Sequence, residues 1–182
     1  MKFEPLPLAG ASLIIPNPHA DERGFFGRIF CEHVFSAAGV DFHIRQMNDS
    51  LSRTAGTTRG FHCLRPPVRE SKLIRCIQGS LMDVIVDLRA GSPTYGRHHM
   101  VKLSAAGREM ILIPHGFAHG YQTLEPDTEI LYFHSDFYSK EHEAGVRIDD
   151  PDLGIPWPRE PACVSQRDRE LPLLRDFTPI EV

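Results

Sequence analysis

Short β-prone segments separated by glycine and proline constrain the fold of this chain more than any other feature. The clearest pair is Thr57–Leu64 and Ser71–Ile77, both rich in apolar and β-forming residues, with Arg65–Pro67 between them. Proline has no N–H to donate to a sheet ladder, so it ends a strand instead of continuing it. The pattern therefore predicts two strands joined by a turn into a hairpin.

The alternation of side chains in this predicted hairpin places a histidine and a lysine on the same face. Successive side chains of a strand point to opposite faces, so His62 and Leu64 would share one face of the first strand. On the return strand, Lys72, Ile74 and Cys76 would alternate in the same way. One face of the hairpin is therefore expected to gather a base and a cation.

The same pattern of short strands and turns continues along the chain. It predicts strands at Ala11–Ile15, His43–Asn48, Ser80–Leu88, His98–Leu103 and Glu109–Ile113, and a second hairpin formed by Gly120–Leu124 and Thr128–His134. The one helix expected before the C-terminal third is Glu32–Ala38, ending at Gly39. Short strands with almost no helix are typical of an all-β antiparallel sandwich or barrel.

The C-terminal segment has a different composition. Residues 139–182 contain six prolines, so we expect this part to wrap the barrel as loop and short helix without adding to the sheet. Within it, the residues from Ser165 to Asp168 are typical of a helix start. With 182 residues, 41% of them hydrophobic, the chain is predicted to be one domain spanning residues 1–182.

Net charge and cysteine content restrict which kinds of ligand the protein can bind and which cellular compartment it suits. A net charge of −4 gives no field that would hold nucleic acid or an anionic membrane, so we expect a small ligand caught by local cations. The four cysteines form no C-x-x-C pair, which favours free thiols in a reducing compartment. No apolar run reaches the roughly 18 residues of a membrane span, and the first ten residues lack a signal-peptide pattern. A cytoplasmic enzyme is the predicted setting.

Three charged residues are ambiguous from the residues alone. Asp83 lies in an otherwise apolar strand, and a buried carboxylate there would need a cation, for which Lys72 is the expected partner. Arg23 is either a solvated loop cation or a functional one, and Asp168 is interpreted as a solvated surface acid.

Two stretches resemble the motifs of the cupin superfamily. Gly56 is followed after five residues by His62, but Leu64 replaces the second histidine, and Lys72 stands six residues before Gly79 where a glutamate is usual. The second motif is present from Pro114 to His119, so only two of the four usual metal ligands remain, His62 and His119. Because a divalent ion needs three or four N, O or S ligands and an ammonium adds unwanted positive charge, we expect a metal-free site.

The chain as a whole resembles the dTDP-4-dehydrorhamnose 3,5-epimerase family over about residues 5–170. The resemblance rests on the order and spacing of motifs that are individually weak: Asp21-Glu22-Arg23-Gly24, Arg59-Gly60-Phe61-His62, Ser71-Lys72-Leu73, the residues from Asp83 to Asp87, Ser92-Pro93-Thr94, the residues from Pro114 to Gly120, Tyr132, Tyr138, Asp150-Pro151 and Trp157-Pro158. It implies a cupin-type antiparallel jelly-roll barrel with a few short helices, mainly near the C-terminus.

The resemblance also implies an activity. Members act at C3 and C5 of dTDP-4-dehydro-6-deoxy-D-glucose to give dTDP-4-dehydro-L-rhamnose, for deoxysugar and lipopolysaccharide or other polysaccharide biosynthesis. Such an epimerase must remove a weakly acidic C–H proton beside a ketone, stabilise the enolate and return a proton on the opposite face. No cofactor is implied. A homodimer is implied, with exchanged N-terminal strands and residues lent by one subunit to the other's pocket.

Residue roles carry over by position. His62 is implied as the general base, Asp168 as the carboxylate that orients it, Lys72 as the donor to the sugar C4 oxygen, and Tyr132 as the acid on the other face. Arg23 and Arg59 are implied to bind the diphosphate. The remaining substrate-binding positions are Phe26, Gln46, Asn48, His119 and Tyr138.

Some positions depart from the family pattern. Arg28 stands where members that prefer thymidine often carry glutamate, Met47 and Asp49 flank Asn48, and Arg147–Asp149 replaces a more usual aromatic-containing segment. These changes leave base identity and the exact sugar open, and Arg28 could instead pair with Glu22 or Glu32.

Three alternatives stay open at this point. A metal-dependent cupin would recruit further ligands from His43, His98 or His115. A non-catalytic barrel that binds a sugar nucleotide, or a storage-type barrel, would not need His62, Lys72, Tyr132 and Asp168 together. A narrower epimerase would act at only one carbon or on another nucleotide-linked 4-keto sugar.

Overall fold

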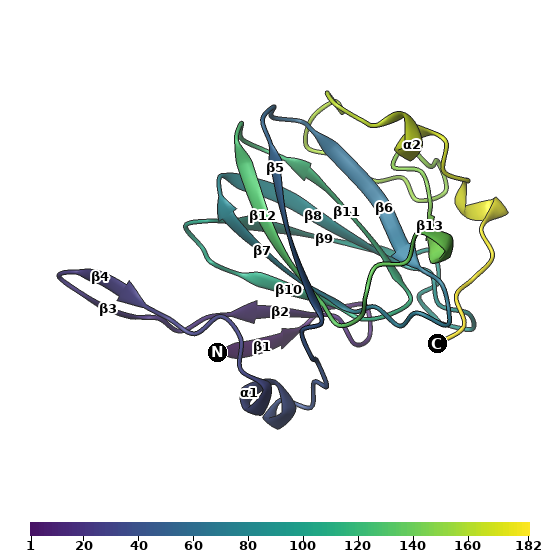
Figure 1. The fold of residues 1–182 in the computed structure, drawn as a ribbon. Helices are drawn as coiled ribbons and strands as arrows, with labels where there is room; N and C mark the ends of the chain where they lie inside the picture. Colours follow the sequence, from purple (N-terminus) through teal and green to yellow (C-terminus); the bar gives the residue numbers. More distant parts are fainter.

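Two antiparallel sheets face each other in the computed structural model, which describes residues 1–182 (Figure 1). The six-stranded sheet has the order β1 (Lys2–Pro5), β2 (Ser12–Ile15), β10 (Met110–Ile113), β7 (Lys72–Gln78), β12 (Thr128–His134) and β5 (Gln46–Ser52). The five-stranded sheet has the order β13 (Glu143–Gly145), β6 (Thr58–Leu64), β11 (Phe117–Thr123), β8 (Ser80–Asp87) and β9 (His98–Ser104). The predicted all-β antiparallel class is confirmed.

The remaining elements are short. A separate ribbon is formed by β3 (His19–Asp21) and β4 (Gly24–Phe26). The helices are α1 (Glu32–Ala37) and α2 (Gln166–Arg169), with 3₁₀ turns at Lys140–His142 and Leu174–Asp176. No helix has both the length and the apolar character that crossing a membrane would require.

Neither predicted hairpin exists. Strands β6 and β7 are consecutive in the chain but belong to opposite sheets, and the same is true of β11 and β12. The sequence identifies a strand by its local pattern, but its partner is chosen by which faces must be buried together, a non-local decision. As a result, His62 and Lys72 do not share a face of one sheet; they approach the same space from opposite sheets.

A buried apolar cluster fills much of the space between the two sheets. It includes Ile74 from β7, Leu81 and Ile85 from β8, Ile111 from β10 and Tyr121 from β11. The side chains of β8 alternate between the two faces of its sheet, since Val84 and Val86 belong to a different cluster on the outer face.

The C-terminal segment packs on that outer face. Val146, Ile148, Leu153, Phe177 and Ile180 form one buried cluster with Phe61, Val84 and Val86. The expectation that this segment adds no strand is wrong for β13, which pairs with β6 at the sheet edge. Gly145 permits the pairing, because a Cβ there would meet the Phe61 carbonyl oxygen at 1.9 Å.

An aromatic cluster covers the other sheet. Helix α1 ends one residue short of the predicted boundary, before Gly39 in the left-handed region at φ +77°. Its Phe35 is fully buried, with ring centroids of Phe3 and Phe30 at 5.1 and 4.8 Å. The helix thereby buries its apolar side against the six-stranded sheet.

The N-terminal region contains more strand than predicted. Strands β1, β3 and β4 lie outside the predicted strands, and β5 continues to Ser52, beyond the predicted end at Asn48. Every residue of β3 and β4 is exposed, so these strands lack the alternating burial that sequence patterns detect. Figure 1 shows this ribbon projecting away from the two sheets.

All four cysteines are free, with Cys63 and Cys76 buried and Cys163 exposed. This agrees with the free thiols expected from their spacing.

Candidate active site

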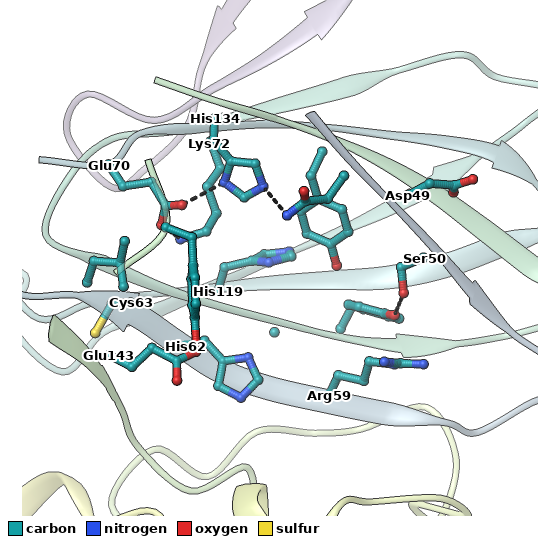
Figure 2. Close-up of a pocket in the computed structure, with 16 residues that line it drawn as sticks. Asp49, Ser50, Arg59, His62, Cys63, Glu70, Lys72, His119, His134 and Glu143 are labelled. Carbon is teal, nitrogen blue, oxygen red and sulfur yellow. Dashed lines mark hydrogen bonds and ion pairs between the residues drawn. The ribbon is translucent and has the colours of Figure 1, made fainter. Parts of the chain in front are cut away.

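A pocket of about 310 Å³ opens between the two sheets. Both sheets contribute to it: β6 and β11 from the five-stranded sheet, and β5, β7 and β12 from the six-stranded one. Figure 2 shows Lys72, Glu70 and His134 grouped on one side, with His62 and Glu143 on the other. The lining residues are Asn48, Asp49, Ser50, Arg59, His62, Cys63, Leu64, Glu70, Lys72, His119, Gly120, Tyr121, Tyr132, His134, Tyr138 and Glu143.

His62 and Asp168 form a hydrogen-bonded pair at the pocket. His62 Nε2 lies 2.8 Å from Asp168 Oδ1, and the Gly60 N–H donates to Asp168 Oδ2 at 3.1 Å. The Asp168 side chain is 5% exposed, so its interpretation as a solvated surface acid is wrong. Burial alone would raise the pKa of Asp168, but hydrogen bonds from His62 and Gly60 lower it overall. His62 itself is 35% exposed, which leaves its ring accessible from the pocket.

Local structure explains how Asp168 reaches β6. Ser165 caps α2, its hydroxyl accepting from the Asp168 N–H at 3.1 Å, which is the helix start that the sequence predicted. Gly60 has φ +123°, and a Cβ there would meet the Gly120 Cα at 2.6 Å and the His119 carbonyl oxygen at 2.9 Å. The close approach of β6 and β11 beside the dyad therefore requires glycine at position 60.

Lys72 is paired with a residue that the sequence did not indicate. Its Nζ lies 2.5 Å from Glu70 Oε2, and the two side chains are 11% and 6% exposed. The predicted pairing of Lys72 with Asp83 is wrong, because Asp83 Oδ2 lies 2.7 Å from His119 Nε2. Lys72 and Asp83 are on different sheets, whereas Glu70 lies two residues before Lys72, the first residue of β7.

Tyr132 enters from β12, opposite the sheet that carries His62. Its ring lies against two histidines, with centroids 5.9 Å from His119 and 5.8 Å from His134, the latter stacked at 7°. Burial, followed by the neighbouring Tyr121 and Asp83, raises the pKa of Tyr132 well above its usual value. The phenol therefore keeps its proton at neutral pH.

The predicted substrate-binding residues Asn48, Arg59 and Tyr138 line the pocket, and Gln46 is hydrogen-bonded to two of them. Gln46 Nε2 donates to Asn48 Oδ1 at 3.1 Å, and Gln46 Oε1 accepts from the Tyr138 N–H at 3.1 Å. Arg59 lies on β6 directly opposite Tyr121 of β11 and lines the pocket with Asn48 and Tyr138.

Two predicted substrate-binding residues are not brought to the pocket. Arg23 and Phe26 lie on the projecting β3–β4 ribbon, where Arg23 pairs with Asp21 and Phe26 is 81% exposed. Arg28 lies beside Phe26 in a separate groove and forms no ion pair with Glu22 or Glu32. Glu32 instead lies 3.1 Å from His43 Nδ1.

Sequence reasoning missed several polar residues of the pocket. Glu143 lies at the pocket wall and accepts from Arg167 at 2.6 Å, while Glu70, His134 and Ser50 line the interior. Glu143 gave no usable signal because it lies in the proline-rich tail, and Glu70 gave none because it lies in the connection between β6 and β7. Ser50 and His134 share a strand face with Asn48 and Tyr132, so the alternation along β5 and β12 could have found them.

The donor set does not match a metal site. No group of three or more His, Cys, Asp or Glu side chains is arranged to hold an ion. The Nε2 atoms of His62 and His119 are each directed at a carboxylate. Metal independence remains a prediction.

Comparison with known proteins identifies the family. The profile described as dTDP-4-dehydrorhamnose 3,5-epimerase matches residues 5–176. The chain belongs to the dTDP-4-dehydrorhamnose 3,5-epimerase family. A curated member from Sinorhizobium fredii is 42% identical over 175 residues, covering 96% of this chain and 90% of the relative.

Solved structures of the family have the same fold. The dTDP-4-dehydrorhamnose 3,5-epimerase from Bacillus anthracis, with TDP and PPi bound, is 41% identical with a TM-score of 0.92, covering 94% of this chain and 98% of that one. The dTDP-6-deoxy-D-glucose-3,5-epimerase from Legionella pneumophila, in complex with dTDP-4-keto-L-rhamnose, is 31% identical with a TM-score of 0.93, covering 100% and 98%.

These similarities confirm the predicted family, cupin fold and activity. The chain has dTDP-4-dehydrorhamnose 3,5-epimerase activity, binds a dTDP-sugar substrate and serves dTDP-rhamnose biosynthesis. The non-catalytic and metal-dependent cupin alternatives are therefore set aside as the main function.

Proposed function

We propose that the epimerase uses His62 as its general base and Tyr132 as its acid, on opposite faces of the sugar ring. The observation that carries this assignment is their placement: His62 lies on β6 and Tyr132 on β12, in opposite sheets, and both line one pocket. A ring held between the sheets presents one face to each residue. Removal of a proton on one face and its return on the other inverts the carbon.

Asp168 supports the base in this proposal. Its carboxylate accepts from His62 Nε2, so His62 Nδ1 is the atom left to take the substrate proton. When His62 becomes an imidazolium, the adjacent carboxylate stabilises the charge, as in other His–Asp pairs.

Lys72 stabilises the intermediate. Loss of the proton beside the ketone places negative charge on the C4 oxygen, and an ammonium in a half-closed pocket offsets that charge strongly. Lys72 is 11% exposed, so water competes little for its N–H donors. Arg59, His119, Asn48, Gln46 and Tyr138 would bind the rest of the substrate, with Arg59 on the diphosphate.

A solvent-exchange experiment tests the reaction. dTDP-4-dehydro-6-deoxy-D-glucose is incubated with the enzyme in D₂O after dialysis against EDTA, and deuterium at C3 and C5 is followed by NMR. We expect incorporation at both carbons, at a rate unchanged by the chelator, because Lys72 supplies the positive charge. Exchange at one carbon would instead identify a single-carbon epimerase, and a rate restored only by added metal would contradict the metal-free mechanism.

We further propose a homodimer in which each β3–β4 ribbon completes the partner's pocket. The ribbon pairs with no strand of either sheet and exposes Phe25 at 51% and Phe26 at 81%. Exposed aromatic side chains beside an arginine are typical of a surface that becomes buried on assembly. Arg23 and Phe26 would then reach substrate across the subunit interface.

Subunit mixing tests the shared pocket. Arg23→Ala and His62→Ala chains are each expected to be nearly inactive alone. Co-expressed, they should regain about a quarter of wild-type turnover, since random pairing makes half of the dimers mixed and each mixed dimer has one intact site. No recovery in mixed dimers isolated by two affinity tags would contradict the shared pocket.

We also propose a cytoplasmic location, because four free cysteines, one of them exposed, suit a reducing compartment. Fractionation of the native host tests this location.

A further inference from the structure

Glu70 holds the ammonium of Lys72 with one oxygen and a histidine with the other. Lys72 Nζ lies 2.5 Å from Oε2, and His134 Nδ1 lies 2.6 Å from Oε1. Glu70 is 6% exposed, and no other ion pair or hydrogen bond holds the Lys72 ammonium. A lysine ammonium sits on a flexible four-carbon stem, so its direction in the pocket depends on this one anchor.

Glu70 is negatively charged at neutral pH, as an anchor for an ammonium must be. Burial alone would raise the pKa of Glu70, but the ammonium of Lys72 and the hydrogen bond from His134 lower it to about 2. The carboxylate is therefore ionised throughout the neutral range. A buried ion pair of this kind is weak as a source of stability, because desolvation of both charges offsets their attraction. Its position in the pocket wall suggests a functional reason for keeping it.

His134 connects this anchor to the rest of the pocket. It lies directly opposite Lys72 across the β7–β12 ladder and opposite Gln46 across the β5–β12 ladder. Its Nε2 accepts from the Asn48 amide at 3.3 Å, and its ring stacks on Tyr132. Figure 2 shows dashed lines on both sides of the His134 ring, one of them the bond to Glu70, so that His134 bridges Glu70 and the Asn48 amide.

We propose that Glu70 and His134 are positioning residues of the epimerase, which fix the Lys72 ammonium toward the substrate oxygen and tie it to Asn48 and Tyr132. The proposal rests on the proposed role of Lys72 at the C4 oxygen. Neither residue needs to donate or take a substrate proton. Their effect reaches the reaction through the direction of the Lys72 ammonium and the placement of the Tyr132 ring.

The expected signature is a loss of turnover without a loss of substrate binding. Glu70→Gln keeps the shape and one acceptor for Lys72 but removes the charge. Lys72 acts on charge that develops only after proton removal, so kcat should fall about tenfold while KM stays within about twofold. A merely structural role would lower thermal stability and leave kcat per folded enzyme unchanged.

A double-mutant cycle with Lys72→Met gives the decisive measurement. In the wild-type background Glu70→Gln should lower kcat about tenfold, but in the Lys72→Met background it should lower kcat less than about twofold, because the group it positions is gone. Equal effects in both backgrounds would overturn the proposal. The matched control is Glu125→Gln, an exposed carboxylate outside the pocket, which should leave kcat unchanged in both backgrounds.

The double-mutant cycle also distinguishes the positioning role of Glu70 from the role of Lys72 at the C4 oxygen. If Lys72→Met alone leaves kcat unchanged, the role of Lys72 fails whatever Glu70 does. If Lys72→Met is strongly impaired and Glu70→Gln is additive with it, only the positioning role fails. Should Glu70→Gln not fold, Glu70→Asp, which keeps the charge but draws the carboxylate back from Lys72 by one methylene, takes its place in the cycle with the same expected coupling.

Discussion

His62→Ala should abolish solvent exchange at both C3 and C5 while leaving the fold intact. Loss of a positioned general base typically lowers a rate by about 10²- to 10⁴-fold, and no other imidazole of the pocket is placed to replace it. His119 and His134 are only 5% and 8% exposed, against 35% for His62, and both ring nitrogens of His134 are already bonded, to Glu70 and Asn48. Deuterium incorporation per mole of folded enzyme, checked by circular dichroism and thermal melting, measures the effect.

The control for this variant is a histidine far from the reaction. His43 is an exposed residue outside the pocket, bonded to Glu32, and His43→Ala should exchange deuterium at the wild-type rate. If the His62→Ala enzyme still exchanges at a rate near wild type, His62 is not the base and the assignment of the His62–Asp168 pair is wrong.

Tyr132→Phe should uncouple exchange from epimerisation. His62 can still remove a proton and return one to the same face, so deuterium enters the substrate with retained configuration. Delivery on the opposite face is lost, and net epimerisation should fall by about 10²- to 10⁴-fold. The exchange rate should fall much less, because proton removal does not need the phenol. NMR of one sample reports both quantities.

The phenylalanine substitution changes one atom, so the packing of the ring is kept. Tyr95 offers a matched control, because its hydroxyl donates to the Phe177 carbonyl at 3.4 Å outside the pocket. Tyr95→Phe should retain both rates. Equal losses of exchange and epimerisation in Tyr132→Phe would mean that Tyr132 acts in proton removal, which contradicts its assignment as the acid.

The electrostatic setting of Tyr132 makes the acid role reasonable. Its raised pKa results from burial, Tyr121 and Asp83, so the hydroxyl is protonated when the enolate forms. A protonated phenol on the face opposite His62 is the form that a proton donor to the enolate requires.

The sequence determined the strands of the central sheets and which residue types could do the chemistry, but not the short strands β1, β3, β4 and β13. Proline and glycine turns bounded β6, β7, β8 and β9 within one or two residues, since turn propensity is local and strong. The motif around His62 and the lysine at a metal-ligand position predicted a metal-free site, whereas the enolate chemistry was implied by the resemblance to the family.

Tertiary structure decided what those residues meet. Strands adjacent in sequence went to opposite sheets, which placed His62 and Lys72 across a pocket and gave Lys72 the partner Glu70 instead of Asp83. It also carried Asp168, 106 positions beyond His62, to within 2.8 Å of its ring. The physical reason is that strand pairing and burial depend on contacts between distant segments, whereas a sequence pattern reports only the periodicity of its own segment.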